Sequence, residues 1–156
     1  MITSKFKSLL QFNALKFAQN LFVIIPLLIM AIIYIFLAGK SIEQIFNEPI
    51  LIVQFITLLT YPFCYLLLKT IRNNIHSEAS SQLLPLWILA ACNLMSFNVI
   101  CSSLLICGIY QEYSKEMFNR NLLTINKKNR STIISLIPLG LLYIFIIFIK
   151  FRLGMF

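Results

Sequence analysis

The sequence predicts an all-α, polytopic integral membrane protein in which four transmembrane helices form an antiparallel bundle. Hydrophobic residues make up 60% of the 156 residues, whereas an average soluble domain contains roughly 45–50%. Charged residues make up 12%, about half of the usual share. A soluble fold of this length has too little interior for so much apolar surface, so we expect the excess to face lipid.

Four apolar runs are long enough to cross a bilayer, whose hydrocarbon core is about 30 Å thick. The first run, LFVIIPLLIMAIIYIFLA, covers roughly 27 Å as a helix. Because the chain has the length of one domain, residues 1–156 are interpreted as a single membrane domain. The predicted spans are residues 21–38, 49–68, 83–110 and 132–149.

A basic segment precedes the first span. Residues 1–20 contain Lys5, Lys7 and Lys16 but no acidic residue, and their apolar side chains are only weakly amphipathic as a helix. This segment is either an interfacial helix or a simple basic flank. The span that follows is longer than the apolar region of a signal peptide, about 7–15 residues, so we expect an uncleaved anchor.

Polar side chains within the spans indicate helix packing. At helical spacing, Gln54, Thr57 and Tyr61 share one stripe of the second span. Asn93 and Ser96 lie in the polar centre of the third. Since hydrogen-bonding side chains in lipid favour neighbouring helices, we predict that these five residues make interhelical contacts. A polar lining for a small-ligand path is the alternative. Residues 69–82, which follow the second span, are predicted to form a polar loop.

The run at residues 83–110 decides the topology. It is the longest uncharged run, and one straight helix of this length would extend roughly 42 Å, beyond the hydrocarbon core. We expect a single tilted helix that projects past the membrane. The alternative is a re-entrant hairpin, but each arm would be too short to cross, and the centre, CNLMSFN, contains no Gly or Pro to form a bend.

The number of basic residues on each side of the membrane depends on whether residues 83–110 cross it. The net charge is +8, from thirteen Lys and Arg against five acidic residues. Four crossings with a cytoplasmic N-terminus place seven basic residues inside and six outside, which is no bias. A re-entrant hairpin would move the loop at residues 111–131 inside and give ten against three, a pattern that follows the positive-inside rule.

The sequence lacks the residue patterns of common catalytic sites. Proton-coupled carriers require an ionisable group within the membrane. No predicted span contains Asp, Glu, Lys, Arg or His. There is no carboxylate pair, glycine-rich phosphate loop or Ser–His arrangement. The four cysteines form no CxxC pair and lie in apolar runs. We therefore predict no enzyme activity, no catalytic or cofactor-binding residue, no cofactor and no metal.

Two functions remain open from the sequence. The first is an accessory, regulatory or protective partner of another membrane component, which needs only packing surfaces and polar contacts. The second is an oligomeric pore or a subunit of a membrane transporter. The expected partners are the lipid bilayer, anionic headgroups near the basic flanks, and a membrane protein or a second copy, with no nucleic acid. We expect a multi-pass protein of the plasma (inner) membrane with a cytoplasmic N-terminus.

Overall fold

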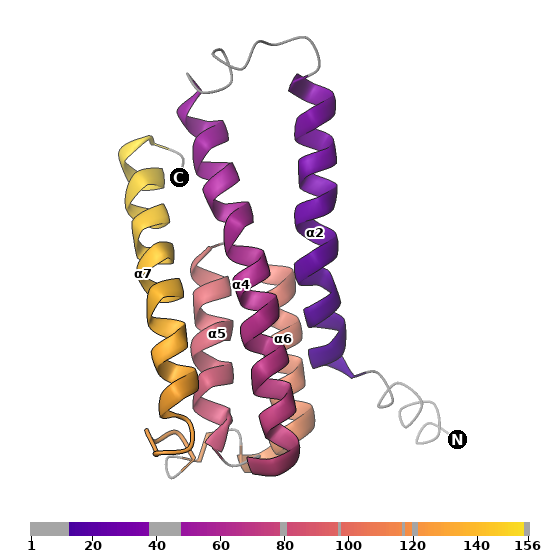
Figure 1. Cartoon of the computed structure of the whole chain (residues 1–156), viewed down its shortest axis with the longest axis vertical. Helices are drawn as coiled ribbons and strands as arrows, with labels where there is room; N and C mark the ends of the chain where they lie inside the picture. Colours follow the sequence, from indigo (N-terminus) through magenta and orange to yellow (C-terminus); the bar gives the residue numbers. More distant parts are fainter. Residues whose placement is uncertain are drawn as a thin grey trace, which may run out of the picture.

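The described part of the chain is entirely helical. The computed structural model describes residues 13–37, 48–78, 81–96, 98–116, 118–119 and 122–154. In chain order the elements are α2 (Ala14–Leu37), α4 (Pro49–Glu78), α5 (Leu83–Met95), α6 (Val99–Tyr113), the short 3₁₀ helix η2 (Ser114–Glu116) and α7 (Arg130–Arg152) (Figure 1). These residues contain no strand, which confirms the predicted all-α class.

Three of the helices are long and apolar enough to cross a membrane. The candidate spans are Ala14–Ile35 in α2, Pro49–Ile75 in α4 and the whole of α7. They overlap the predicted spans at 21–38, 49–68 and 132–149, and they fit the predicted membrane protein. Of the predicted N-terminal segment, residues 1–12 lie outside the described part of the chain, and residues 14–20 form the first turns of α2.

The prediction of a single helix over residues 83–110 is wrong. α5 ends at Met95, and α6 begins at Val99 and packs back against α5, so the two helices form a hairpin. The two helices have 13 and 15 residues and are therefore roughly 20 and 22 Å long. Each is shorter than the hydrocarbon core of about 30 Å. The described residues thus form three long apolar helices and two shorter ones, and they do not confirm the predicted four spans.

The predicted polar loop at residues 69–82 is largely helix. α4 continues to Glu78 because Leu68, Ile71 and Ile75 are buried at helical spacing and hold the extension against the bundle. Lys69 is exposed on this extension and Arg72 is half-buried. The basic residues that suggested a loop are therefore polar positions of an amphipathic helix end.

The five helices form a ring at one end of the molecule. α4 packs against α2 and α7, α6 packs against α2, α5 packs against α7, and the hairpin closes the ring through the α5–α6 contact. Figure 1 shows that the hairpin accompanies the three long helices over only part of their length, while α2, α4 and α7 continue beyond its turn. The hairpin turn therefore lies at an intermediate depth of the bundle.

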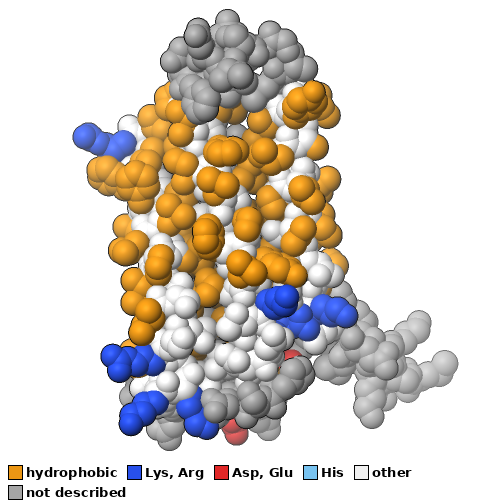
Figure 2. All heavy atoms as spheres, viewed as in Figure 1, with side chains coloured by type: hydrophobic (Ala, Val, Ile, Leu, Met, Phe, Trp, Pro, Cys, Tyr) orange, Lys and Arg blue, Asp and Glu red, His pale blue; other side chains and the backbone are white. Residues whose placement is uncertain are grey.

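Basic side chains mark the end of the molecule at which the hairpin opens. The start of α2, the end of α4, the ends of the hairpin and the start of α7 all meet there (Figure 1). On the face drawn in Figure 2, Lys and Arg gather at this end, and apolar side chains cover the surface above them. We call it the basic end. Lys150 and Arg152 lie in the last turn of α7, at the opposite end.

Candidate functional site

The hairpin turn is built by two asparagine side chains. Asn98 Oδ1 caps α6 by accepting a hydrogen bond from the Cys101 amide at 3.3 Å, and Asn98 Nδ2 donates to Asn93 Oδ1 at 3.3 Å. The Asn98 backbone amide donates to the Asn93 carbonyl at 3.0 Å. Asn is a favoured residue at the start of a helix because its short side chain accepts such bonds. These contacts supply the turn that we had expected to require Gly or Pro.

The two arms of the hairpin are also joined directly. Ser102 Oγ on α6 donates to the Ala90 carbonyl on α5 at 3.0 Å. At the end of α5 itself, Ser96 Oγ donates to the Asn93 carbonyl at 2.8 Å. Irregular backbone at membrane depth is tolerated only where its polar groups are satisfied within protein or by water. Short hydroxyl and amide side chains satisfy polar groups of the turn here.

A buried polar cluster connects the hairpin turn to α4 and α7. Tyr143 Oη lies 3.1 Å from Thr60 Oγ1 and 3.4 Å from Cys64 Sγ. Asn93 Nδ2 lies 3.9 Å from Cys64 Sγ and 2.9 Å from the Leu89 carbonyl. We define the hairpin-tip cluster as Thr60, Cys64, Asn93, Ser96, Asn98 and Tyr143.

The hairpin-tip cluster contains no charged residue, and most of its side chains are buried. Thr60, Cys64 and Asn93 are 0% exposed, and Tyr143 is 3% exposed. Thr60 Oγ1 also bonds the Thr57 carbonyl at 2.7 Å. A buried polar group without a partner is destabilising by about 1–3 kcal/mol, so these mutual contacts favour one position of the hairpin. The arrangement can fix a helix; it presents no charged group that could transfer a proton.

The five residues predicted to make interhelical polar contacts lie in different surroundings. Asn93 and Ser96 belong to the hairpin-tip cluster. Tyr61 is buried, with its ring edge-on to Phe22 of α2 at a centroid distance of 6.1 Å. Thr57 Oγ1 donates to the Val53 carbonyl of its own helix at 2.8 Å. Gln54 is exposed on α4, so the structure does not bring it together with the others.

Four residues of the hairpin-tip cluster were not among the predicted contacts: Thr60, Cys64, Asn98 and Tyr143. A signal for Tyr143 exists in the sequence, since it is the only side chain with a hydroxyl group between Leu136 and Ile149. Buried tyrosine hydroxyls usually find a partner. Asn98 has a weaker signal: on one straight helix it points away from Asn93, and only the break in the helix brings the two amides together.

At the basic end, two further contacts tie α2 to its neighbours. Arg72 Nη1 on α4 donates to Gln19 Oε1 on α2. Gln111 Oε1 on α6 accepts from the Ala14 amide at 3.1 Å, where it satisfies one of the amides that the first turn of a helix leaves free. Side-chain amides therefore link α2 to both the long helix α4 and the hairpin.

The described residues include no group of three His, Cys, Asp or Glu side chains that could hold a metal ion. Cys64, Cys92 and Cys101 are buried, Cys107 is exposed, and none of the four forms a disulfide. Among the buried side-chain polar atoms that the structure describes, Gln82 Oε1 is the one without a hydrogen-bond partner.

Comparison with protein families, with curated proteins and with solved structures found no match for this chain. The fold and the hairpin-tip cluster therefore supply the functional argument.

Proposed function

We propose that this chain is a multi-pass membrane protein without catalytic machinery of its own, which acts as an accessory, regulatory or protective partner of another membrane component. The observation that carries the proposal is the hairpin-tip cluster. Its buried polar side chains contact one another and the backbone, and none of them carries a charge at neutral pH. Such a cluster positions a helix and leaves the outer surface for recognition.

We also propose that the chain crosses the membrane three times, with α5 and α6 as a re-entrant hairpin that enters from the basic end. This topology places ten of the thirteen basic residues on one side and three on the other. The positive-inside rule then favours a cytoplasmic basic end, a cytoplasmic N-terminus and a C-terminus on the opposite side. A plasma (inner) membrane location accords with this orientation. A reporter fused after residue 120 tests the side of the loop.

A transport role is the second candidate, and the broken helix favours it. The carbonyl end of α5 and the amide end of α6 meet within the bundle, where Ser96 and Asn98 are the cap residues. In transporters, discontinuous helices use such ends to hold ions and substrates near the bilayer midplane. In this chain, however, Asn98 caps α6 and the Ser96 amide bonds the Cys92 carbonyl at 3.2 Å, so part of the exposed backbone is already engaged.

One pair of measurements separates the two functions. The purified protein is reconstituted in liposomes and tested for ion flux, and the same tagged chain is purified from its native membrane under mild detergent. An accessory role predicts no flux above empty liposomes and a partner that co-purifies in fixed stoichiometry. Flux that disappears in a variant of the turn, such as Asn98→Ala, with no co-purifying partner, would instead support the transport role.

A further inference from the structure

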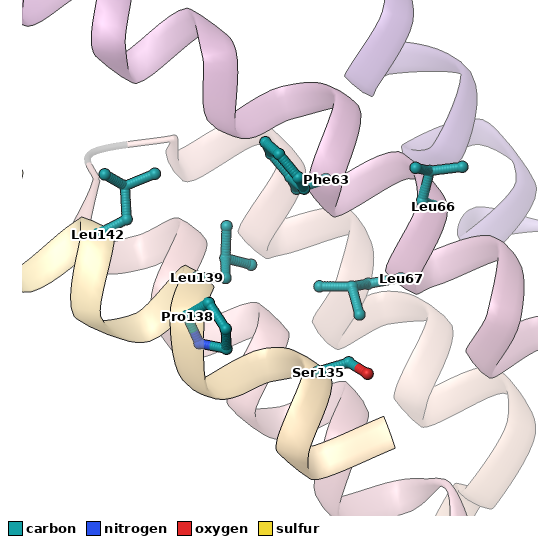
Figure 3. Close-up of a pocket in the computed structure, with 7 residues that line it drawn as sticks. All are labelled: Phe63, Leu66, Leu67, Ser135, Pro138, Leu139 and Leu142. Atoms are coloured by element: carbon teal, nitrogen blue, oxygen red, sulfur yellow. The ribbon is translucent and has the colours of Figure 1, made fainter. Parts of the chain in front are cut away.

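A groove between α4 and α7 is not used by the hairpin-tip cluster. It has a volume of about 330 Å³, at the lower end of the roughly 300–1,000 Å³ that is typical of small-ligand pockets. Figure 3 shows Leu67 of α4 and Leu139 of α7 pointing toward each other across it. The remaining lining residues are Phe63, Leu66, Ser135, Pro138 and Leu142. The lining is apolar except for the Ser135 hydroxyl.

Small side chains on α7 leave this seam unfilled. Ser135 and Pro138 face the groove, whereas the adjacent outward positions of α7 carry larger side chains, such as Ile134 and Ile137. Ser135 Oγ donates to the Ser131 carbonyl one turn earlier, at 3.0 Å, so its single polar group is satisfied within the helix. The groove therefore presents an essentially apolar wall.

The groove opens to the outside of the bundle at the depth of one leaflet. Phe63, Leu66, Ser135 and Pro138 are all exposed. Along α7, the lining begins five residues from Arg130 and ends at Leu142, which corresponds to roughly 7–18 Å from the basic end of the helix. One leaflet of a bilayer core about 30 Å thick extends roughly 15 Å. The groove therefore coincides with the acyl-chain region of the leaflet at the basic end.

Basic residues follow the groove-lining segments toward the basic end of the molecule. Lys69 on α4, Lys127 before α7 and Arg130 at its first position are all exposed. Thr70 and Ser131, also exposed, add hydroxyl groups there. α7 contains no acidic residue, and the only acidic residue of α4 is its last, Glu78. Basic pockets between helices at the cytoplasmic side are suited to the headgroups of anionic lipids.

We propose that the α4–α7 groove binds one acyl chain of an anionic glycerophospholipid from the leaflet at the basic end. The phosphate-bearing headgroup then lies against Lys69 and Arg130. The proposal rests on the apolar groove and on the charge beside it, and it holds whichever of the two functions above is correct. The experiment distinguishes this lipid from two other occupants of the groove, a neutral phospholipid and a second copy of the chain.

Native mass spectrometry of the full-length, delipidated protein tests the proposal. The protein is titrated with phosphatidylglycerol and with phosphatidylcholine of the same acyl chains. We expect one phosphatidylglycerol to bind at least fivefold more tightly than phosphatidylcholine. Ser135→Phe and Leu66→Trp, which fill the groove from opposite helices at exposed positions, should remove this first site. Ser103→Phe, at an exposed position of α6, adds the same bulk elsewhere and should retain it.

Charge variants complete the experiment. Lys69→Gln and Arg130→Gln should each weaken the phosphatidylglycerol site by about fivefold and leave phosphatidylcholine binding unchanged, whereas Lys16→Gln on α2 should have little effect. Equal binding of the two lipids, or wild-type affinity in both groove-filling variants, would overturn the proposal. The proposal would also be overturned if the chain forms a dimer that Ser135→Phe dissociates and neither lipid binds preferentially to the groove. Thermal unfolding in detergent verifies that each variant is folded.

Discussion

Asn98 Nδ2 donates a hydrogen bond to Asn93 Oδ1 at 3.3 Å across the turn between α5 and α6. Asn98 Oδ1 meanwhile accepts from the Cys101 amide, so one side chain both caps a helix and closes the turn. This dual role allows an uncharged run to reverse direction without Gly or Pro. It also makes Asn98 the residue on which the hairpin depends most.

Replacement of Asn98 should therefore destabilise the hairpin. Asn98→Ala removes the cap of α6 and the partner of Asn93, and the expected loss is about 1–3 kcal/mol of unfolding free energy. Asn98→Ser retains a cap acceptor but loses the amide donor, so its loss should be smaller, about 1 kcal/mol. Circular dichroism during SDS titration of the detergent-solubilised protein measures both. An Asn98→Ala variant that unfolds together with the wild type would contradict this role.

Tyr143 joins the third long helix to the same cluster. Tyr143→Phe removes the hydroxyl that Thr60 and Cys64 contact and keeps the ring. Hydrogen bonds between membrane helices contribute about 0.6 kcal/mol on average, and we expect a loss of about 0.5–1.5 kcal/mol because both partners are buried. Tyr34→Phe is the matched control, since Tyr34 is 78% exposed. Equal stability of the two variants would show that the Tyr143 hydroxyl does not stabilise the helix packing.

Close packing of α2 on α6 requires Gly108. A Cβ atom added there would lie 2.3 Å from Leu15 Cδ2 and 2.6 Å from Leu15 Cγ, with the Leu15 amide nitrogen at 3.3 Å. Leu15 would have to leave its position, so Gly108→Ala should destabilise the protein by about 1–3 kcal/mol. The same SDS titration measures the change.

Gly140 of α7 provides the control for that experiment. A Cβ atom added at Gly140 meets no atom within 4 Å, and Ala has a higher helix propensity than Gly. Gly140→Ala should therefore be as stable as the wild type or slightly more stable. If the two substitutions had equal effects, the contact between Gly108 and Leu15 would not determine how α2 packs.

Much of the fold could be predicted because it depends on local composition and spacing. The long apolar runs that became α2, α4 and α7 indicate membrane helices by their length and hydropathy. α4 extends beyond the predicted end at residue 68 because Leu68, Ile71 and Ile75 are buried at helical spacing. The prediction of a loop rested on the charged residues Lys69 and Arg72 instead. The apolar periodicity continued through the charged residues, and tertiary packing decided the outcome.

The hairpin and its cluster were harder to predict because they depend on contacts between distant residues. Asn93 and Ser96 were identified from the polar centre of their run. Cys64 on α4 contacts Asn93, 29 residues away in sequence, and Tyr143 on α7 contacts Cys64, 79 residues away. The charge distribution gave the better indication, since only a loop after α6 that returns to the basic end gives the ten-to-three division of basic residues that the positive-inside rule favours.

The side of the loop between α6 and α7 tests the re-entrant hairpin most directly. Single cysteines are placed at Asn13, Ile125 and Leu153 in a full-length chain whose exposed Cys107 is replaced by alanine, while the buried Cys64, Cys92 and Cys101 are kept. They are labelled with a membrane-impermeant maleimide in intact and in permeabilised cells. We predict that Asn13→Cys and Ile125→Cys react only after permeabilisation, whereas Leu153→Cys reacts in intact cells. Labelling of Ile125→Cys on the side opposite to Asn13→Cys would show that the segment crosses the membrane, and would contradict the account.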